Sequence, residues 1–220
     1  MPALVHRVRD SLLPRALGPL VGAVVRGPAR GADGHPLLYV TVDDGPDAEG
    51  TPTLLDALDR HDARAVFFLS AGRAEAHPDL VRQTVEAGHR VGSHGDAHVS
   101  AWRQPGAATV AAYDRAERVL ESLTGEAVRD VRPPYGRVSP ALWRWAQGGR
   151  RIVLWDTMPG DFDARQTPSA LADAIVQLAL PGSIVALHDG PPAARAVAAL
   201  DLALPRLRAA GWRFPALPAR

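Results

Sequence analysis

The chain contains no cysteine and no lysine among its 220 residues. Without cysteine, neither a disulfide nor a Cys-ligated zinc ion can be part of the design. We attribute the missing lysine to a coding bias, because a functional need for guanidinium groups would not remove lysine from the whole surface. No apolar run is as long as a membrane-spanning helix requires. These absences exclude disulfide scaffolds, Cys-type zinc sites and transmembrane helices.

The remaining composition is typical of a globular protein. Hydrophobic residues make up 46% of the chain and charged residues 22%. A net charge of +1 argues against a protein that coats nucleic acid, so we expect no nucleic-acid partner. The length suits one domain with a short appendage, and we expect a monomer.

The first 34 residues form a leader, which we expect to pack on a single domain at 35–220. Its apolar stretch 16–25 follows several arginines, as in a signal peptide, but Gly18-Pro19 interrupts it and no small-x-small cleavage site follows Arg26. The sequence therefore favours a cytoplasmic location. An extracytoplasmic location and contact of the arginine-rich leader with an anionic membrane surface are the alternatives.

After the leader, apolar stretches alternate with helical patterns. Seven strands are predicted, at 37–42, 65–69, 90–93, 127–131, 151–155, 183–187 and 211–214. Helices are predicted at 51–59, 77–87, 106–123, 139–147, 167–180 and 192–210, several of them opening on a Ser-Pro, Thr-Pro or His-Pro pair. This alternation predicts an α/β fold with a parallel sheet, closed as a barrel or left open.

Asp43 and Asp44 end the first predicted strand and are followed by Gly45-Pro46. Asp-Gly-Pro sequences often form simple turns, which is the plainest interpretation. Two adjacent carboxylates at the carboxyl end of a buried strand, however, repel each other and lose hydration. That arrangement is costly unless a cation or a proton resolves it.

Polar residues gather after the predicted strands, at their carboxyl ends, whereas the opposite loops hold mainly turn residues and scattered arginines. The gathered residues are Asp43, Asp44, His94, Asp96, His98, Arg132, Asp156, Asp161, His188 and Asp189. The carboxyl edge of a parallel sheet is where α/β proteins build their sites. This asymmetry predicts a functional site there.

His94 and His98 are four residues apart, a spacing that brings two imidazoles to one metal ion if the backbone is helical or tightly turned. Such a pair alone is more often incidental. One carboxylate of the first strand would complete a two-histidine, one-carboxylate site for a single divalent transition metal. Zinc suits this set best, with cobalt, nickel or manganese as alternatives. The second carboxylate would then be a candidate general base.

Two further residues suit such a site. Arg132 could be a surface guanidinium or half of a structural ion pair, but Pro133-Pro134 stiffens the backbone after it, as aiming a side chain requires. His188 could be a turn or core histidine. Opposite a metal, it would be suited to protonate a leaving group near neutral pH.

Over about residues 37–214 the chain resembles the polysaccharide deacetylases of the NodB-homology type, carbohydrate esterase family four. Five segments carry the resemblance: 41–45 (TVDDG), 94–98 (HGDAH), 132–135 (RPPY), 161–162 (DF) and 185–188 (VALH). Each is short and unspecific by itself. Their order and spacing together are highly specific. The resemblance implies a distorted, incomplete (β/α)7 barrel and hydrolysis of N-acetyl groups on an amino sugar or glycan.

The resemblance also implies a role for each matching residue. Asp43 is implied as catalytic base and His188 as catalytic acid, with Asp44, His94 and His98 holding the metal. Arg132 is implied to orient Asp43, and Asp161 to contact Arg132. Tyr135 would offer its backbone N–H to the oxyanion, Phe162 would wall the sugar groove, and Leu187 would line the pocket for the acetyl methyl group.

Three positions depart from the family pattern: Gly95 replaces a usual Ser or Thr, Phe162 a common Trp, and Met158 an acid found in many members. Asp96 is a candidate to accept a hydrogen bond from a ligand histidine in place of the missing hydroxyl. The altered groove leaves a second interpretation open, in which the protein is an amidase or deformylase that acts on a small substrate. A non-catalytic carbohydrate-binding relative is the third.

Overall fold

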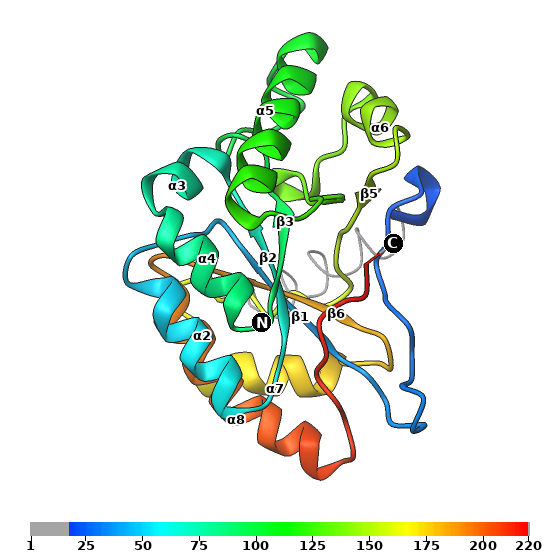
Figure 1. Cartoon of the computed structure of the whole chain (residues 1–220). Coiled ribbons are helices and arrows are strands. Elements are labelled where there is room, and N and C mark those ends of the chain that lie inside the picture. The colour runs from blue at the N-terminus through cyan, green and yellow to red at the C-terminus, as the bar shows by residue number, and fades with distance from the viewer. Residues whose placement is uncertain (1–17, 220) are drawn as a thin grey trace.

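Six parallel strands form one sheet in the order β5-β4-β3-β2-β1-β6 (Figure 1). The structure is a computed structural model that describes residues 18–219. The strands are β1 (Tyr39–Asp43), β2 (Ala65–Leu69), β3 (Arg90–Ser93), β4 (Asp130–Val131), β5 (Arg151–Ile152) and β6 (Ile184–His188). The predicted α/β fold with an incomplete barrel is confirmed.

Helices connect successive strands. They are α2 (Gly50–Arg60), α3 (Ala71–Ala76), α4 (Pro78–Glu86), α5 (Gly106–Thr124), α6 (Pro140–Ala146), α7 (Pro168–Leu178) and α8 (Ala193–Ala209), with short 3₁₀ turns η1 (Gly18–Val21) and η2 (Pro134–Gly136). The Ser-Pro and Thr-Pro predictions are confirmed, since the hydroxyls of Ser139 and Thr167 accept the backbone N–H groups that open α6 and α7. The short helix α3 was not predicted.

The seventh predicted strand, 211–214, is absent from the described sheet. It makes a single bridge, between Leu37 and Arg213, instead of a ladder. The fourth and fifth strands are also shorter than predicted. Beyond Ile152 the regular ladder gives way to isolated contacts: Val153 forms a bridge with Val24, and the carbonyls of Val153 and Leu154 accept hydrogen bonds from the Arg132 side chain. After β5, the chain contacts β6 through a bridge between Thr157 and Val185 and a few hydrogen bonds of Asp156 and Thr157, without a continuous ladder, which leaves the barrel incomplete.

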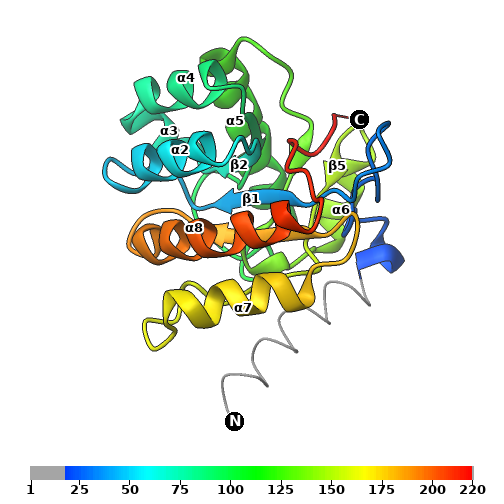
Figure 2. The ribbon, with the colours of Figure 1, turned by 90° about the horizontal axis from the view of Figure 1, so that it is seen from below.

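Side chains of the central strands alternate between two apolar cores. In β1, Val40 and Val42 pack into a core beneath the helices, whereas Tyr39 joins a second core on the concave side of the sheet. In Figures 1 and 2, α2, α3 and α4 lie on one side of the central strands β1 and β2. The edge strand β5 and the segment that begins at residue 18 lie on the other side. The concave side therefore faces the open part of the barrel.

The described part of the leader, residues 18–34, lies against the concave side. Val24 forms a bridge with Val153, and Arg26 forms an ion pair with Asp156 at 2.6 Å. Residues 1–17 lie outside the described part of the chain, so the leader boundary at residue 34 remains a prediction. Between residues 18 and 219, no helix is both long and apolar enough to cross a membrane.

Candidate functional site

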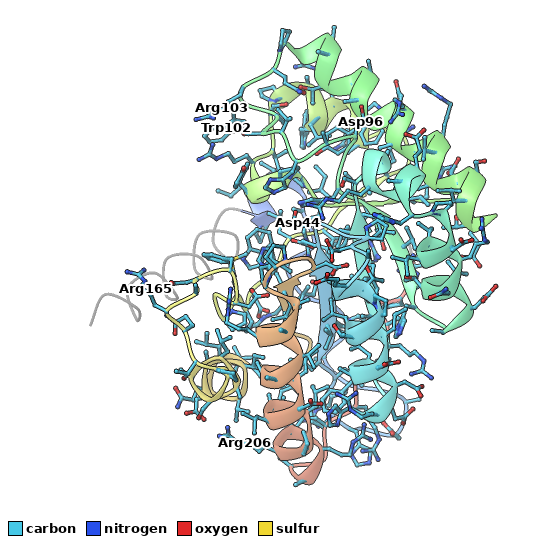
Figure 3. All side chains as sticks on the ribbon, turned by 90° about the vertical axis from the view of Figure 1, so that its left-hand side faces the viewer. Asp44, Asp96, Trp102, Arg103, Arg165 and Arg206 are labelled. Atoms are coloured by element: carbon cyan, nitrogen blue, oxygen red, sulfur yellow. The ribbon has the colours of Figure 1, made fainter. Side chains whose placement is uncertain are left out.

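Asp43 and Asp44 mark the carboxyl end of β1, where the site is built. Asp43 is the last residue of the strand and lies in register with His188, the last residue of β6. Asp44 follows with a φ of 75°, in the left-handed region that L side chains rarely adopt. The turn gives the two adjacent carboxylates different neighbours. In the view of Figure 3, Asp44 lies between α5 and α8.

Asp44, His94 and His98 form a compact group of possible metal ligands. Asp44 Oδ1 lies 3.3 Å from Nε2 of each histidine, and the three ligand atoms are within 4.8 Å of one another. The buried Asp44 Oδ1 has no hydrogen-bond partner in the structure. One carboxylate oxygen and two imidazole nitrogens converging on one point are a suitable donor set for a divalent cation. The group therefore fits a metal ion.

Electrostatics at the triad also favour an ionised carboxylate. Burial by itself would raise the pKa of Asp44, but the close contact and charge of His94, with the charges of His188 and His98, lower that pKa to about 2. The pKa of His98 is lowered, chiefly because burial disfavours its charged form. An ionised carboxylate with neutral imidazoles is the protonation state that binds a metal.

Asp96, in the loop between the two histidines, does not have the partner that we expected from the sequence. Its carboxylate forms an ion pair with Arg115 of α5 instead of accepting from a ligand histidine. The buried Nδ1 of His94 has no partner in the structure. Asp96 points to α5 because Gly95 turns the chain with a φ of 85°. The hypothesis of a supporting role for Asp96 is wrong in this geometry.

Arg132 and Asp43 form a buried ion pair with a separation of 2.7 Å between Nη1 and Oδ1. Arg132 also donates to the Thr41 hydroxyl and to the carbonyls of Val153 and Leu154. Burial lowers the pKa of Arg132, while the adjacent Asp43 opposes that shift. These bonds fix the guanidinium, which in turn holds Oδ1 of Asp43. Within the described residues, Oδ2 of Asp43 accepts no hydrogen bond.

Asp161 contacts His188 and not Arg132, contrary to the sequence-based expectation. Its Oδ1 lies 2.9 Å from His188 Nδ1, and its Oδ2 accepts the His188 backbone N–H at 2.7 Å. Arg132 bonds to Asp43, Thr41 and two carbonyls, while Asp161 meets the end of β6. Burial lowers the pKa of His188, but the charge and hydrogen bond of Asp161, with Asp43 and Asp44, raise it to about 9.

Tyr135 and Phe162 lie at the edge of the site. Tyr135 has a φ of 61° in η2, and its ring packs 4.6 Å from that of His98. Phe162 makes an edge-to-face contact with His188. Both line the cavity that holds the acids and histidines.

Leu187 does not line this cavity. Its fully buried side chain belongs to the core beneath the helices. Because strand side chains alternate, a residue next to the inward-facing His188 points the other way. The expectation that Leu187 forms the acetyl-methyl pocket is therefore not met, because the β6 residues on the concave side are Ile184, Ala186 and His188.

The cavity has a volume of about 800 Å³ and includes residues that the sequence did not single out. They come from η1, from the loop before α5, from the segment after η2 and from the segment after β5. They are Gly18, Val21, Trp102, Gly136, Arg137, Val138, Leu154 and Trp155. Most are apolar and carry no sequence signal of a site. Trp102, labelled in Figure 3, donates from its indole to the Val138 carbonyl at 3.1 Å.

A family model described as polysaccharide deacetylase matches residues 30–148, more than half of the chain. The chain belongs to this family. The matched region contains Asp43, Asp44, the two triad histidines and Arg132, so it covers most of the site.

Relatives and solved structures agree with the family. The chain is 34% identical over 208 residues to a chitooligosaccharide deacetylase of Sinorhizobium fredii, covering 86% of this chain and 94% of that protein. It is 32% identical over 188 residues to a peptidoglycan-N-acetylglucosamine deacetylase of Bacillus cereus, covering 81% of this chain but 66% of that protein, slightly less than two thirds. A crystal structure of a peptidoglycan N-acetylglucosamine deacetylase superposes with a TM-score of 0.85 at 29% identity, covering 93% of this chain and 95% of the other.

Family membership assigns the chain to the carbohydrate N-deacetylases, enzymes that hydrolyse an amide bond on a sugar. The Asp44–His94–His98 triad, at the expected positions, is a candidate for the metal site of such a hydrolase.

Proposed function

We propose that this polysaccharide deacetylase removes acetyl groups from an N-acetylated amino sugar or glycan, with one zinc ion held by Asp44, His94 and His98. The observation that carries the proposal is the buried Asp44 Oδ1, which lies without a hydrogen-bond partner between two imidazole nitrogens. Beside it in the same cavity are a carboxylate and an imidazole, Asp43 and His188, on adjacent strands. This set supports a metal-assisted amide hydrolysis.

A divalent cation in the triad would act as a Lewis acid, lowering the pKa of water and polarising the amide carbonyl. Asp43 is suited to take the proton from the attacking water. Arg132 engages Oδ1 of Asp43, which leaves Oδ2 for that water. Arg132 is thus a positioning residue that holds the base in its orientation.

His188 is suited to donate a proton to the departing amine. Its Nδ1 is held by Asp161, so the other ring nitrogen, Nε2, is available to the cavity. The charge of Asp161 stabilises the imidazolium form, which is the form that can act as an acid. Asp161 therefore supports the acid, instead of the base as the family resemblance implied.

Tyr135 and Phe162 complete the proposed site. The left-handed conformation of Tyr135 orients the peptide between Pro134 and Tyr135, whose N–H would bind the oxyanion of the tetrahedral intermediate. Phe162, half exposed beside His188, offers a flat apolar wall to a sugar ring. The substrate of each relative supports a glucosamine-type sugar for this chain.

A substrate panel with purified, zinc-reconstituted protein tests this function. We expect acetate release from N-acetylglucosamine oligomers and no reaction with N-formylated amines that lack a sugar. The reverse preference would support a deformylase function, which the altered positions Met158 and Phe162 suggested. Stoichiometric zinc without hydrolysis of any member of the panel would support a non-catalytic carbohydrate-binding protein.

A further inference from the structure

Asp189 is a buried acid that the proposed chemistry does not use. It follows the proposed catalytic acid His188 directly in the sequence and is 2% exposed. It is not among the residues that line the cavity, so it does not contact a bound sugar. A carboxylate at such a position has lost its hydration, and this loss is costly unless other groups bond to it. The partners of Asp189 therefore indicate its role.

The Asp189 carboxylate is bonded to the loop that connects β1 to α2. Its Oδ2 accepts a hydrogen bond from the Thr51 hydroxyl at 2.5 Å, and its Oδ1 accepts one from the Gly190 N–H at 2.7 Å. The Thr51 hydroxyl oxygen in turn accepts a hydrogen bond from the backbone N–H of Asp47 at 2.8 Å. These bonds join the end of β6 to the loop after β1 and to the first turn of α2.

Two glycines allow the backbone after β1 to pack directly on this carboxylate. A Cβ added at Gly45 would lie 2.6 Å from Asp189 Oδ2, and one added at Gly50 would overlap with Oδ1. Both contacts would be closer than van der Waals packing allows, so a larger residue at either position would displace the carboxylate. Glycine is the residue that permits such a close approach. The carboxylate thus fills the space that these two glycines leave.

Asp189 contacts both neighbours of the proposed metal ligand Asp44. Its backbone N–H donates to the carbonyl of Asp43 at 2.9 Å, and its carboxylate packs against Gly45. Asp44 lies between these two residues with a φ of 75°. A residue other than glycine keeps such a conformation only where its surroundings hold the backbone in place. Asp189 supplies such contacts on both sides of Asp44.

We infer that Asp189 is a positioning residue for Asp44. By holding the residues before and after Asp44, it keeps Asp44 Oδ1 at 3.3 Å from the Nε2 atoms of His94 and His98. Asp189 acts through the backbone and takes no part in the proposed proton transfers. This inference rests on the proposed function, in which Asp44 is a zinc ligand.

The zinc affinity of the folded protein tests the inference, and competition with a fluorescent zinc chelator measures it. Asp189→Ala removes the carboxylate and frees the loop. We expect its Kd for zinc to rise about ten-fold or more, as for other groups that orient a metal ligand. Asp189→Asn keeps the size of the side chain and one oxygen for the Thr51 hydroxyl, so we expect it to recover most of the lost affinity.

A second pair of variants changes the other side of the same contact. Thr51→Val removes the hydroxyl at nearly constant shape, whereas Thr51→Ser keeps a hydroxyl. We expect the valine variant to bind zinc more weakly than the parent and the serine variant to keep the parent affinity. Asp173→Ala is the control. The Asp173 carboxylate pairs with Arg206 at the surface, and its loss should leave the zinc Kd unchanged.

A merely structural role for Asp189 would give a different result. It would lower the melting temperature of the zinc-free protein but leave the zinc Kd of the folded protein unchanged. Circular dichroism at the assay temperature establishes that each variant is folded. A zinc Kd equal to that of the parent in Asp189→Ala would therefore overturn the inference. If Asp189→Ala does not fold, the zinc Kd of Thr51→Val decides in the same way.

Asp44→Asn, measured in the same assay, separates this inference from the proposed function. If Asp44→Asn binds zinc as tightly as the parent, the metal assignment of the proposed function fails and the inference fails with it. If Asp44→Asn loses zinc but Asp189→Ala keeps the parent Kd, the inference alone is wrong. None of these measurements needs turnover, so weaker zinc binding by Asp189→Ala would support the positioning role even if no acetylated sugar were hydrolysed.

Discussion

Arg132 donates to Asp43 across 2.7 Å in a fully buried ion pair at the floor of the cavity. The guanidinium is fixed by further bonds to Thr41 and to two backbone carbonyls, so the pair has little freedom to move. This relationship joins stability to function, since the same contact satisfies a buried charge and orients the proposed base.

Arg132→Met should lower the free energy of unfolding by about 3–5 kcal/mol, because it leaves the Asp43 carboxylate buried without its partner. Chemical denaturation measures the change. The double variant Arg132→Met, Asp43→Asn should recover part of the loss. Arg206→Met is the matched control, since Arg206 pairs with Asp173 at the surface (Figure 3) and its loss should cost less than about 1 kcal/mol. Equal losses for the two single variants would contradict the role of the buried pair.

Asp161→Asn should shift the alkaline limb of the pH–rate profile to lower pH. The carboxylate raises the pKa of His188 to about 9, and the proposed acid works in its protonated form, which is present below that pKa. Removing the negative charge lowers the pKa, so the protonated form is lost at a lower pH. Asp163→Asn, two residues away at a partly exposed position where the carboxylate pairs with Arg165, should leave the profile unchanged. If the alkaline limb of the pH–rate profile does not move in Asp161→Asn, then His188 is not the group whose titration causes that limb.

Chelation should abolish activity, and added zinc should restore it, because the triad contains the ligands that the proposed hydrolysis uses. His94→Ala should also lose bound metal, measured by elemental analysis after dialysis. His77→Ala is the control, since His77 lies outside the triad between α3 and α4. Full metal content in His94→Ala would contradict the assignment of the ligands.

Gly95→Ala should destabilise the protein by about 1–2 kcal/mol, because the backbone there has a φ of 85° that alanine adopts only with strain. Space is not the limiting factor, as an added Cβ would lie 3.4 Å from the Tyr113 ring. We also expect weaker zinc binding, since the strain acts on the peptide next to His94. Gly72→Ala in α3 is the matched control, where helical backbone should make the change neutral or stabilising. Thermal melts with and without zinc measure both effects.

The sequence predicted the parts of the molecule that depend on local pattern. Ser139-Pro140 and Thr167-Pro168 marked the starts of two helices, because capping and proline act within a few residues. The approach of Asp44 to His94 and His98 followed from strand ends meeting at one edge of a parallel sheet. These signals are contained in short segments and in the order of the strands.

Other features depend on long-range packing and could not be predicted locally. Asp161 reaches His188 from a loop 27 residues earlier in the sequence, a contact that no short segment reveals. The shortness of β5 is also a long-range feature, since beyond Ile152 the chain contacts Val24 of the leader and the Arg132 side chain instead of continuing a ladder. The position of Leu187 is different: alternation from His188 already placed it on the opposite face, and that signal was available in the sequence.

Acetate release by zinc-loaded Asp43→Asn, compared with the parent on N-acetylglucosamine oligomers, tests the central claim most directly. The division of labour between the two acids predicts that the variant retains a full equivalent of zinc but loses at least about 100-fold in kcat, the usual contribution of a positioned general base. Hydrolysis at the parent rate with the metal still bound would contradict the assignment of Asp43 as the base.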